Sequence, residues 1–93
     1  MTNLNTIANK IIKEQELIIG PVAWNEARKV SGLKIINEKS GEVSFEGDPK
    51  QVIDRLVAQY ENLFGRASHE VCKEAVSALI VDLMPSEIPA SLK

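Results

Sequence analysis

The sequence predicts a small, helix-rich α+β domain in the order α-α-β-β-α-α, with one central antiparallel hairpin packed against amphipathic helices. Three observations predict this fold. Apolar residues recur at helical spacing in four segments, a short alternating pattern lies mid-chain, and glycine or proline separates the segments. The chain has 93 residues, of which 44% are hydrophobic and 26% charged, as expected for one globular domain. We therefore expect a single domain over residues 1–84 and a loose tail over residues 85–93.

The N-terminal part predicts two helices. The first covers residues 3–19 and places its apolar side chains on one face. Gly20 suits the end of this helix, and Pro21 suits the first turn of a second, shorter helix. The apolar face of the first helix comprises Leu4, Ile7, Ala8, Ile11, Ile12, Ile18 and Ile19.

The middle of the chain predicts a β-hairpin. Residues 33–36 (LKII) and 42–46 (EVSFE) have the composition of strands, and Gly41 in the loop between them can adopt a positive φ. Val43 and Phe45 alternate with polar residues, so one face is expected to be buried. Because two strands alone are marginally stable, the helices or a second copy must cover them.

A third helix follows over residues 49–64. Asp48 is expected to be its N-cap, Pro49 its first residue, and Gln51 the partner that completes a capping box. Gly65 is expected to end the helix.

A fourth helix is predicted from Ser68 to just before Pro85, and it carries His69 and Cys72, the only histidine and cysteine of the chain. Cys72 falls near the centre of the apolar face, which favours a buried thiol that acts as a small hydrophobe. His69 lies at the edge of that face. A zinc site needs four ligands, or three and a water, so this pair would need carboxylates or a second copy to complete it. We therefore predict no metal site, no catalytic residue, no cofactor and no enzymatic activity.

The charge balance disfavours nucleic acid as a partner. Eleven basic and thirteen acidic residues give a net charge of −2, whereas nucleic-acid binders usually present a basic face. One alternative remains, a DNA-binding regulator in which Asn25, Arg28 and Lys29 of the short second helix contact DNA. Trp24 on the same helix is a candidate partner contact, although a role in the core is favoured.

The function predicted from these observations is a non-catalytic, homodimerising interaction or regulatory module, which binds itself and possibly another protein. The first helix carries more apolar surface than one neighbour needs, which is typical of an interface. Gln15 lies within its apolar face, where a polar residue can set partner choice, unless this stretch is simply exposed. The candidate interface comprises Leu4, Ile11, Gln15, Leu17 and Ile18. Pairing of two hairpin edges is an alternative geometry.

A third possibility is a small-ligand sensor with a pocket near Trp24, Phe45 and Tyr60. The expected location is the cytoplasm, without a membrane partner. One cysteine cannot form an intramolecular disulfide, the first ten residues lack the pattern of a signal peptide, and no apolar run approaches the roughly 18–20 residues that span a bilayer.

Overall fold

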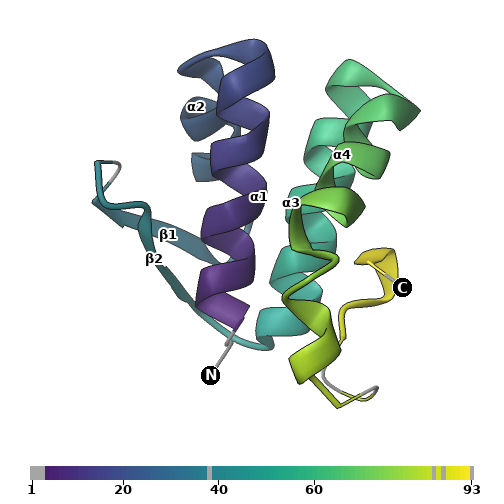
Figure 1. Cartoon of the computed structure of the whole chain (residues 1–93). Helices are drawn as coiled ribbons and strands as arrows, with labels where there is room; N and C mark the ends of the chain where they lie inside the picture. The colour runs from purple at the N-terminus through teal and green to yellow at the C-terminus, as the bar shows by residue number, and fades with distance from the viewer. Residues whose placement is uncertain (1–3, 38, 85, 87, 93) are drawn as a thin grey trace.

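The computed structural model describes residues 4–37, 39–84, 86 and 88–92. Over these residues the predicted order α-α-β-β-α-α is confirmed (Figure 1). The elements are α1 (Leu4–Ile19), α2 (Val22–Arg28), β1 (Leu33–Asn37), β2 (Glu42–Phe45), α3 (Pro49–Phe64), α4 (Arg66–Val76) and the short 3-10 helices η1 (Ile80–Asp82) and η3 (Ala90–Leu92).

The hairpin pairs β1 with β2 in antiparallel register. Leu33 lies opposite Phe45 and Ile35 opposite Val43, and the register shifts between Ile35 and Asn37. Leu33 and Val43 are buried against the helices.

Gly41 begins the return from the hairpin loop with a φ of 75°, as predicted, and it is buried. A side chain at this position would meet the side-chain amide of Asn9 on α1. The glycine therefore allows both the positive φ and the close approach of the hairpin to α1. Glu38 of the same loop lies outside the described residues.

The predicted N-cap, first residue and final glycine of α3 are confirmed, but the Asp48 side chain bonds to Lys50 and not to Gln51, so the capping box does not form as predicted. The Asp48 side chain accepts a hydrogen bond from the Lys50 backbone N–H at 3.0 Å, and Pro49 is the first helical residue. Gly65, with a φ of 90°, ends the helix and donates its N–H to Glu61 O at 2.8 Å. The bonds that cap the two ends of α3 are therefore local in sequence.

The boundaries predicted for the fourth helix were wrong. α4 begins at Arg66, so Ser68 is a buried helical residue instead of the N-cap, and the helix ends at Val76. Ser77 then bonds back to the Glu74 carbonyl through both its N–H and its hydroxyl, the kind of local bond that competes with helix continuation. The predicted stop, Pro85, lies outside the described residues.

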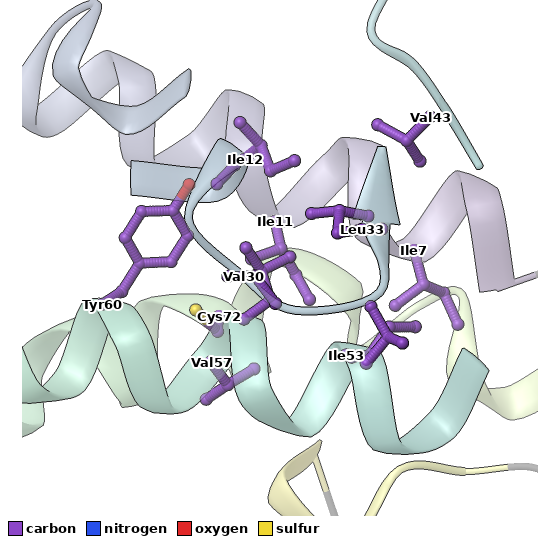
Figure 2. Packing of buried hydrophobic residues seen from close by; sticks show 14 of the residues in the cluster. Ile7, Ile11, Ile12, Val30, Leu33, Val43, Ile53, Val57, Tyr60 and Cys72 are labelled. Atoms are coloured by element: carbon purple, nitrogen blue, oxygen red, sulfur yellow. The ribbon is translucent and has the colours of Figure 1, made fainter. Parts of the chain in front are cut away.

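The core lies between α1, α2, α3, α4 and the inner face of the hairpin. α1 occupies its middle, since it contacts α2, α3, α4 and β2. Figure 2 shows side chains from these elements meeting around Ile11, with Tyr60 and Cys72 at one side. The Tyr60 hydroxyl donates to the Ala23 carbonyl at 2.7 Å and joins α3 to α2. The largest completely buried hydrophobic side chains are Tyr60, Ile7, Ile11, Ile12, Ile53, Leu56 and Leu92, and Trp24 is almost completely buried.

The expectation of a loose tail was wrong for residues 88–92. Pro89 and Leu92 are buried, and Ile88 packs against the core. η3 contacts both α3 and α4. Pro89 and Leu92 therefore belong to the core. The prolines and polar residues of this segment had suggested that it has little to pack.

Candidate functional site

Gln15 is completely buried and makes a polar cluster with α4. Its side-chain Nε2 donates to the Ser68 carbonyl at 3.1 Å and to Cys72 Sγ at 3.3 Å. Its Oε1 accepts from the Ser68 hydroxyl at 3.3 Å. The amide is therefore satisfied inside the chain, as a buried polar group must be. Gln15 sets the pairing of α1 with α4 and is not available to a second copy.

Cys72 is buried, and its predicted place in the core is confirmed. Burial raises the pKa of its thiol to about 11. The thiol thus stays protonated at neutral pH, whereas nucleophilic and metal-binding cysteines act as thiolates. Among the described residues, no three His, Cys, Asp or Glu side chains lie close enough together to hold a metal ion.

His69 connects three parts of the fold. Its Nδ1 lies 2.8 Å from Glu61 Oε2 at the end of α3, and its Nε2 lies 2.6 Å from the Ser91 carbonyl oxygen in η3. The backbone hydrogen bond with Ser91 is the largest cause of the raised pKa of His69; burial opposes it, and the hydrogen bond with Glu61 raises the pKa further. Sequence analysis missed this site because neither Glu61 nor Ser91 is near His69 in sequence.

The predicted contact surface on α2 divides into a buried and an exposed part. Trp24 is 2% exposed and donates its indole N–H to Glu16 Oε2 at 2.9 Å, so its core role is confirmed. Asn25, Arg28 and Lys29 are exposed, and Arg28 donates to Asn25 Oδ1 at 3.1 Å.

Lys29 is engaged in a small network with α3. Its ammonium lies 3.1 Å from Glu26 Oε2, and Gln59 donates to Glu26 Oε1 at 2.9 Å. The hydrogen bonds from Gln59 and Lys29 lower the pKa of Glu26. The positive charge of Lys29 is therefore paired with a carboxylate on its own helix.

The residues expected to form a ligand pocket are not arranged around a common cavity. Tyr60 is fully buried and bonded to α2, and Phe45 lies on the hairpin beside Leu33. A groove of about 570 Å³ has Trp24 in its lining but neither Phe45 nor Tyr60. It is lined by Lys10, Lys13, Glu14, Glu16, Leu17, Pro21, Trp24 and Lys39. This groove is open, and Lys10 pairs with Glu14 across one turn at 2.9 Å.

The candidate interface on α1 is also divided. Ile11 and Gln15 are buried within the chain and cannot contact a second copy in this fold. Leu4 packs against the core at the start of α1. Leu17 and Ile18 remain, and they are 79% and 62% exposed. The helical pattern placed Ile18 correctly on α1 but could not show that no other element covers it.

Four exposed apolar side chains lie at one end of the molecule, where two pairs of helices are connected. The α1–α2 and α3–α4 connections both lie at the top of Figure 1. Ile18 and Val22 flank the first connection, and Leu63 and Phe64 precede the second; all four are exposed. The bond from Tyr60 to Ala23 places the last turn of α3 beside the start of α2. We call these four residues, Ile18, Val22, Leu63 and Phe64, the apolar end.

No helix over the described part of the chain is both long and apolar enough to cross a membrane. Comparison with known proteins gave no match to a protein-family model, to a curated protein or to a solved structure.

Proposed function

We propose that this protein is a non-catalytic interaction module of the cytoplasm that forms a homodimer through its apolar end. The observation that carries the proposal is the exposure of Ile18, Val22, Leu63 and Phe64 at the end where α1 and α3 terminate and α2 and α4 begin. Apolar side chains grouped in this way on a small domain are typical of an association surface.

The size of the chain supports self-association. A domain of this length buries a modest share of its unfolded surface, so a second copy adds core that one copy lacks. In a symmetric dimer the same patch lies on both sides of the axis, so its apolar side chains face each other. Asn62 and Arg66, which are exposed next to the apolar end, would form the polar rim of such an interface.

A non-catalytic role is supported by the state of the polar side chains. Cys72 is protonated at neutral pH, Tyr60 donates to a carbonyl within the core, and Glu26 is held by Gln59 and Lys29. Their shifted pKa values follow from burial or from structural hydrogen bonds. The single, buried free cysteine agrees with a reducing compartment.

The test is the oligomeric state across a wide concentration range, measured by light scattering on a size-exclusion column. Ile18→Lys is the main variant. Ile36→Lys is its matched control, because Ile36 is 59% exposed and lies on the hairpin, away from the apolar end. We expect the wild type to dimerise, Ile18→Lys to weaken the dimer at least tenfold, and Ile36→Lys to leave it unchanged.

Two results would contradict the proposal. A wild-type chain that stays monomeric at millimolar concentration has no homodimer interface. A dimer that is lost in Ile36→Lys but kept in Ile18→Lys associates through the hairpin, as in the alternative geometry of paired strand edges. Circular dichroism of each variant establishes that its fold is intact, since both side chains are exposed in the monomer.

A further inference from the structure

The segment 88–92 lies on α3 and α4 and is held there by polar contacts at Ser91. The Ser91 N–H and hydroxyl both donate to Asp54 Oδ1, at 3.0 and 2.6 Å. The Ser91 carbonyl oxygen lies 2.6 Å from His69 Nε2. Pro89 and Leu92 on either side are buried. The N–H, the hydroxyl and the carbonyl of Ser91 therefore each have a hydrogen-bond partner.

The two partners of His69 require a particular protonation state. Glu61 Oε2 is a carboxylate oxygen and Ser91 O is a carbonyl oxygen, and both accept hydrogen bonds without a proton to donate. A neutral imidazole carries one N–H and one lone pair, so it satisfies only one of them. The imidazolium carries two N–H groups and satisfies both. The observed geometry is therefore that of the protonated ring.

We propose that His69 is a pH-dependent clasp that holds segment 88–92 on α3 and α4 when protonated and loosens it when neutral. Deprotonation leaves a ring lone pair facing either the Glu61 carboxylate or the Ser91 carbonyl. The bond to Ser91 or the bond to Glu61 is then lost, and the segment opens more often. Opening uncovers the apolar surface of α3 and α4 that Leu92 covers in the closed form.

The charged groups around the ring favour its protonated form. Glu61 on α3 contacts it directly, and Glu70 on α4 adds a second negative charge nearby. Asp54 on α3 accepts hydrogen bonds from Ser91 and adds a further negative charge next to the segment. Arg66 and Lys73 are the basic residues nearest to His69 along α4. The hydrogen bond to Ser91 is the largest cause of the raised pKa of His69, so closure of the segment and protonation of the ring stabilise each other.

The sign of the effect follows from linkage. The pKa of His69 is raised in the closed form, so the ring's contribution to closure is fully present below the ordinary value of about 6.5. It is lost as the pH rises through the pKa of the closed form. The equilibrium constant for opening is larger above both pKa values of His69 than below them. The factor is about ten for each unit by which the pKa of His69 in the closed form exceeds its pKa in the open form.

The test measures the pKa of His69 by NMR and, in the same samples, the hydrogen-exchange protection of the Ser91 amide from pH 5 to 8.5. Protection must be corrected for the intrinsic dependence of exchange on pH. We expect a pKa above 6.5 and a loss of protection whose midpoint coincides with it. His69→Gln, which cannot be protonated, should abolish this transition. Glu61→Gln should move the midpoint to lower pH.

Asp54→Asn is the matched control, because it weakens the other contact to Ser91 and leaves both contacts of the ring in place. It should lower the protection of Ser91 at every pH, while the pH transition in that protection remains. Three results would overturn the proposal: a pKa of His69 at or below 6.5, a Ser91 protection independent of pH, or a pH transition that survives in His69→Gln. Because the clasp lies within one chain, none of these outcomes depends on dimerisation.

Discussion

Replacing Ser68 by alanine removes the hydroxyl that donates to the buried Oε1 of Gln15. Gln15 is 0% exposed, so water cannot take the place of the hydroxyl without entering the core. A buried acceptor left without a donor costs about 1–3 kcal/mol. The gain in helix propensity from serine to alanine offsets up to about 0.5 kcal/mol of this. We expect Ser68→Ala to destabilise the fold by about 1–2 kcal/mol, or roughly 4–15 °C in Tm.

Gln15→Leu provides the second arm of a double-mutant cycle. It removes the amide and leaves the Ser68 hydroxyl free to turn to the Gly65 carbonyl, which already accepts the Ser68 N–H. In the double variant both the amide and the hydroxyl are gone, so no buried acceptor is left without its donor. The loss in free energy of unfolding should therefore be smaller than the sum of the two single losses by about 1 kcal/mol. Urea unfolding, followed by Trp24 fluorescence and by far-ultraviolet circular dichroism, measures all four free energies.

Ser77→Ala is the control for this cycle, since Ser77 is exposed and lies at the end of the same helix. It should change the free energy of unfolding by less than about 0.5 kcal/mol. The reasoning is refuted if Ser68→Ala lowers the free energy of unfolding by no more than Ser77→Ala does. It is also refuted if the effects of Gln15→Leu and Ser68→Ala add to within about 0.3 kcal/mol, as the effects of independent sites do.

Three further predictions concern single positions. Cys72, with a pKa of about 11, should react with a thiol reagent at pH 8 only after unfolding, and rapid reaction in the native state would contradict its buried position. Gly41→Ala should destabilise more than Gly20→Ala in thermal unfolding, because both have positive φ but only at Gly41 does a side chain meet Asn9. Tyr60→Phe should cost about 1 kcal/mol in urea unfolding through loss of a buried hydrogen bond, whereas an unchanged midpoint would show that the hydroxyl contributes nothing.

Most of the secondary structure could be predicted from the sequence because its signals are local. Asp48, Pro49 and Gly65 mark the ends of α3 through their own backbone and side-chain preferences. Gly41 marks the hairpin for the same reason. The end of α4 was missed, because apolar residues continue at helical spacing after the helix has stopped at Val76.

The candidate sites were harder to predict because they depend on which elements meet. Gln15 was recognised as an unusual residue on an apolar face, but its partners on α4 are 53 and 57 positions away. Periodicity placed Ile11 and Ile18 on the same face of α1. Only the tertiary structure shows that Ile11 is covered and Ile18 is not. His69 was tested as a metal ligand, and its contacts with Glu61 and Ser91 became visible only once the chain was folded.

The position of α1 in the middle of the core has a consequence for the order of folding. α1 comes first among the described helices. The buried Gln15 amide in α1 is satisfied by Ser68 and Cys72, which lie 53 and 57 positions later in the sequence. The N-terminal helices and the hairpin therefore lack part of their core until α4 packs against α1. Bringing α1 and α4 together closes a long loop, and the entropy lost in that closure must be overcome before the contacts form. We expect the chain to fold as one cooperative unit, more slowly than a helical bundle of equal length in which each helix packs mainly on its neighbours in sequence.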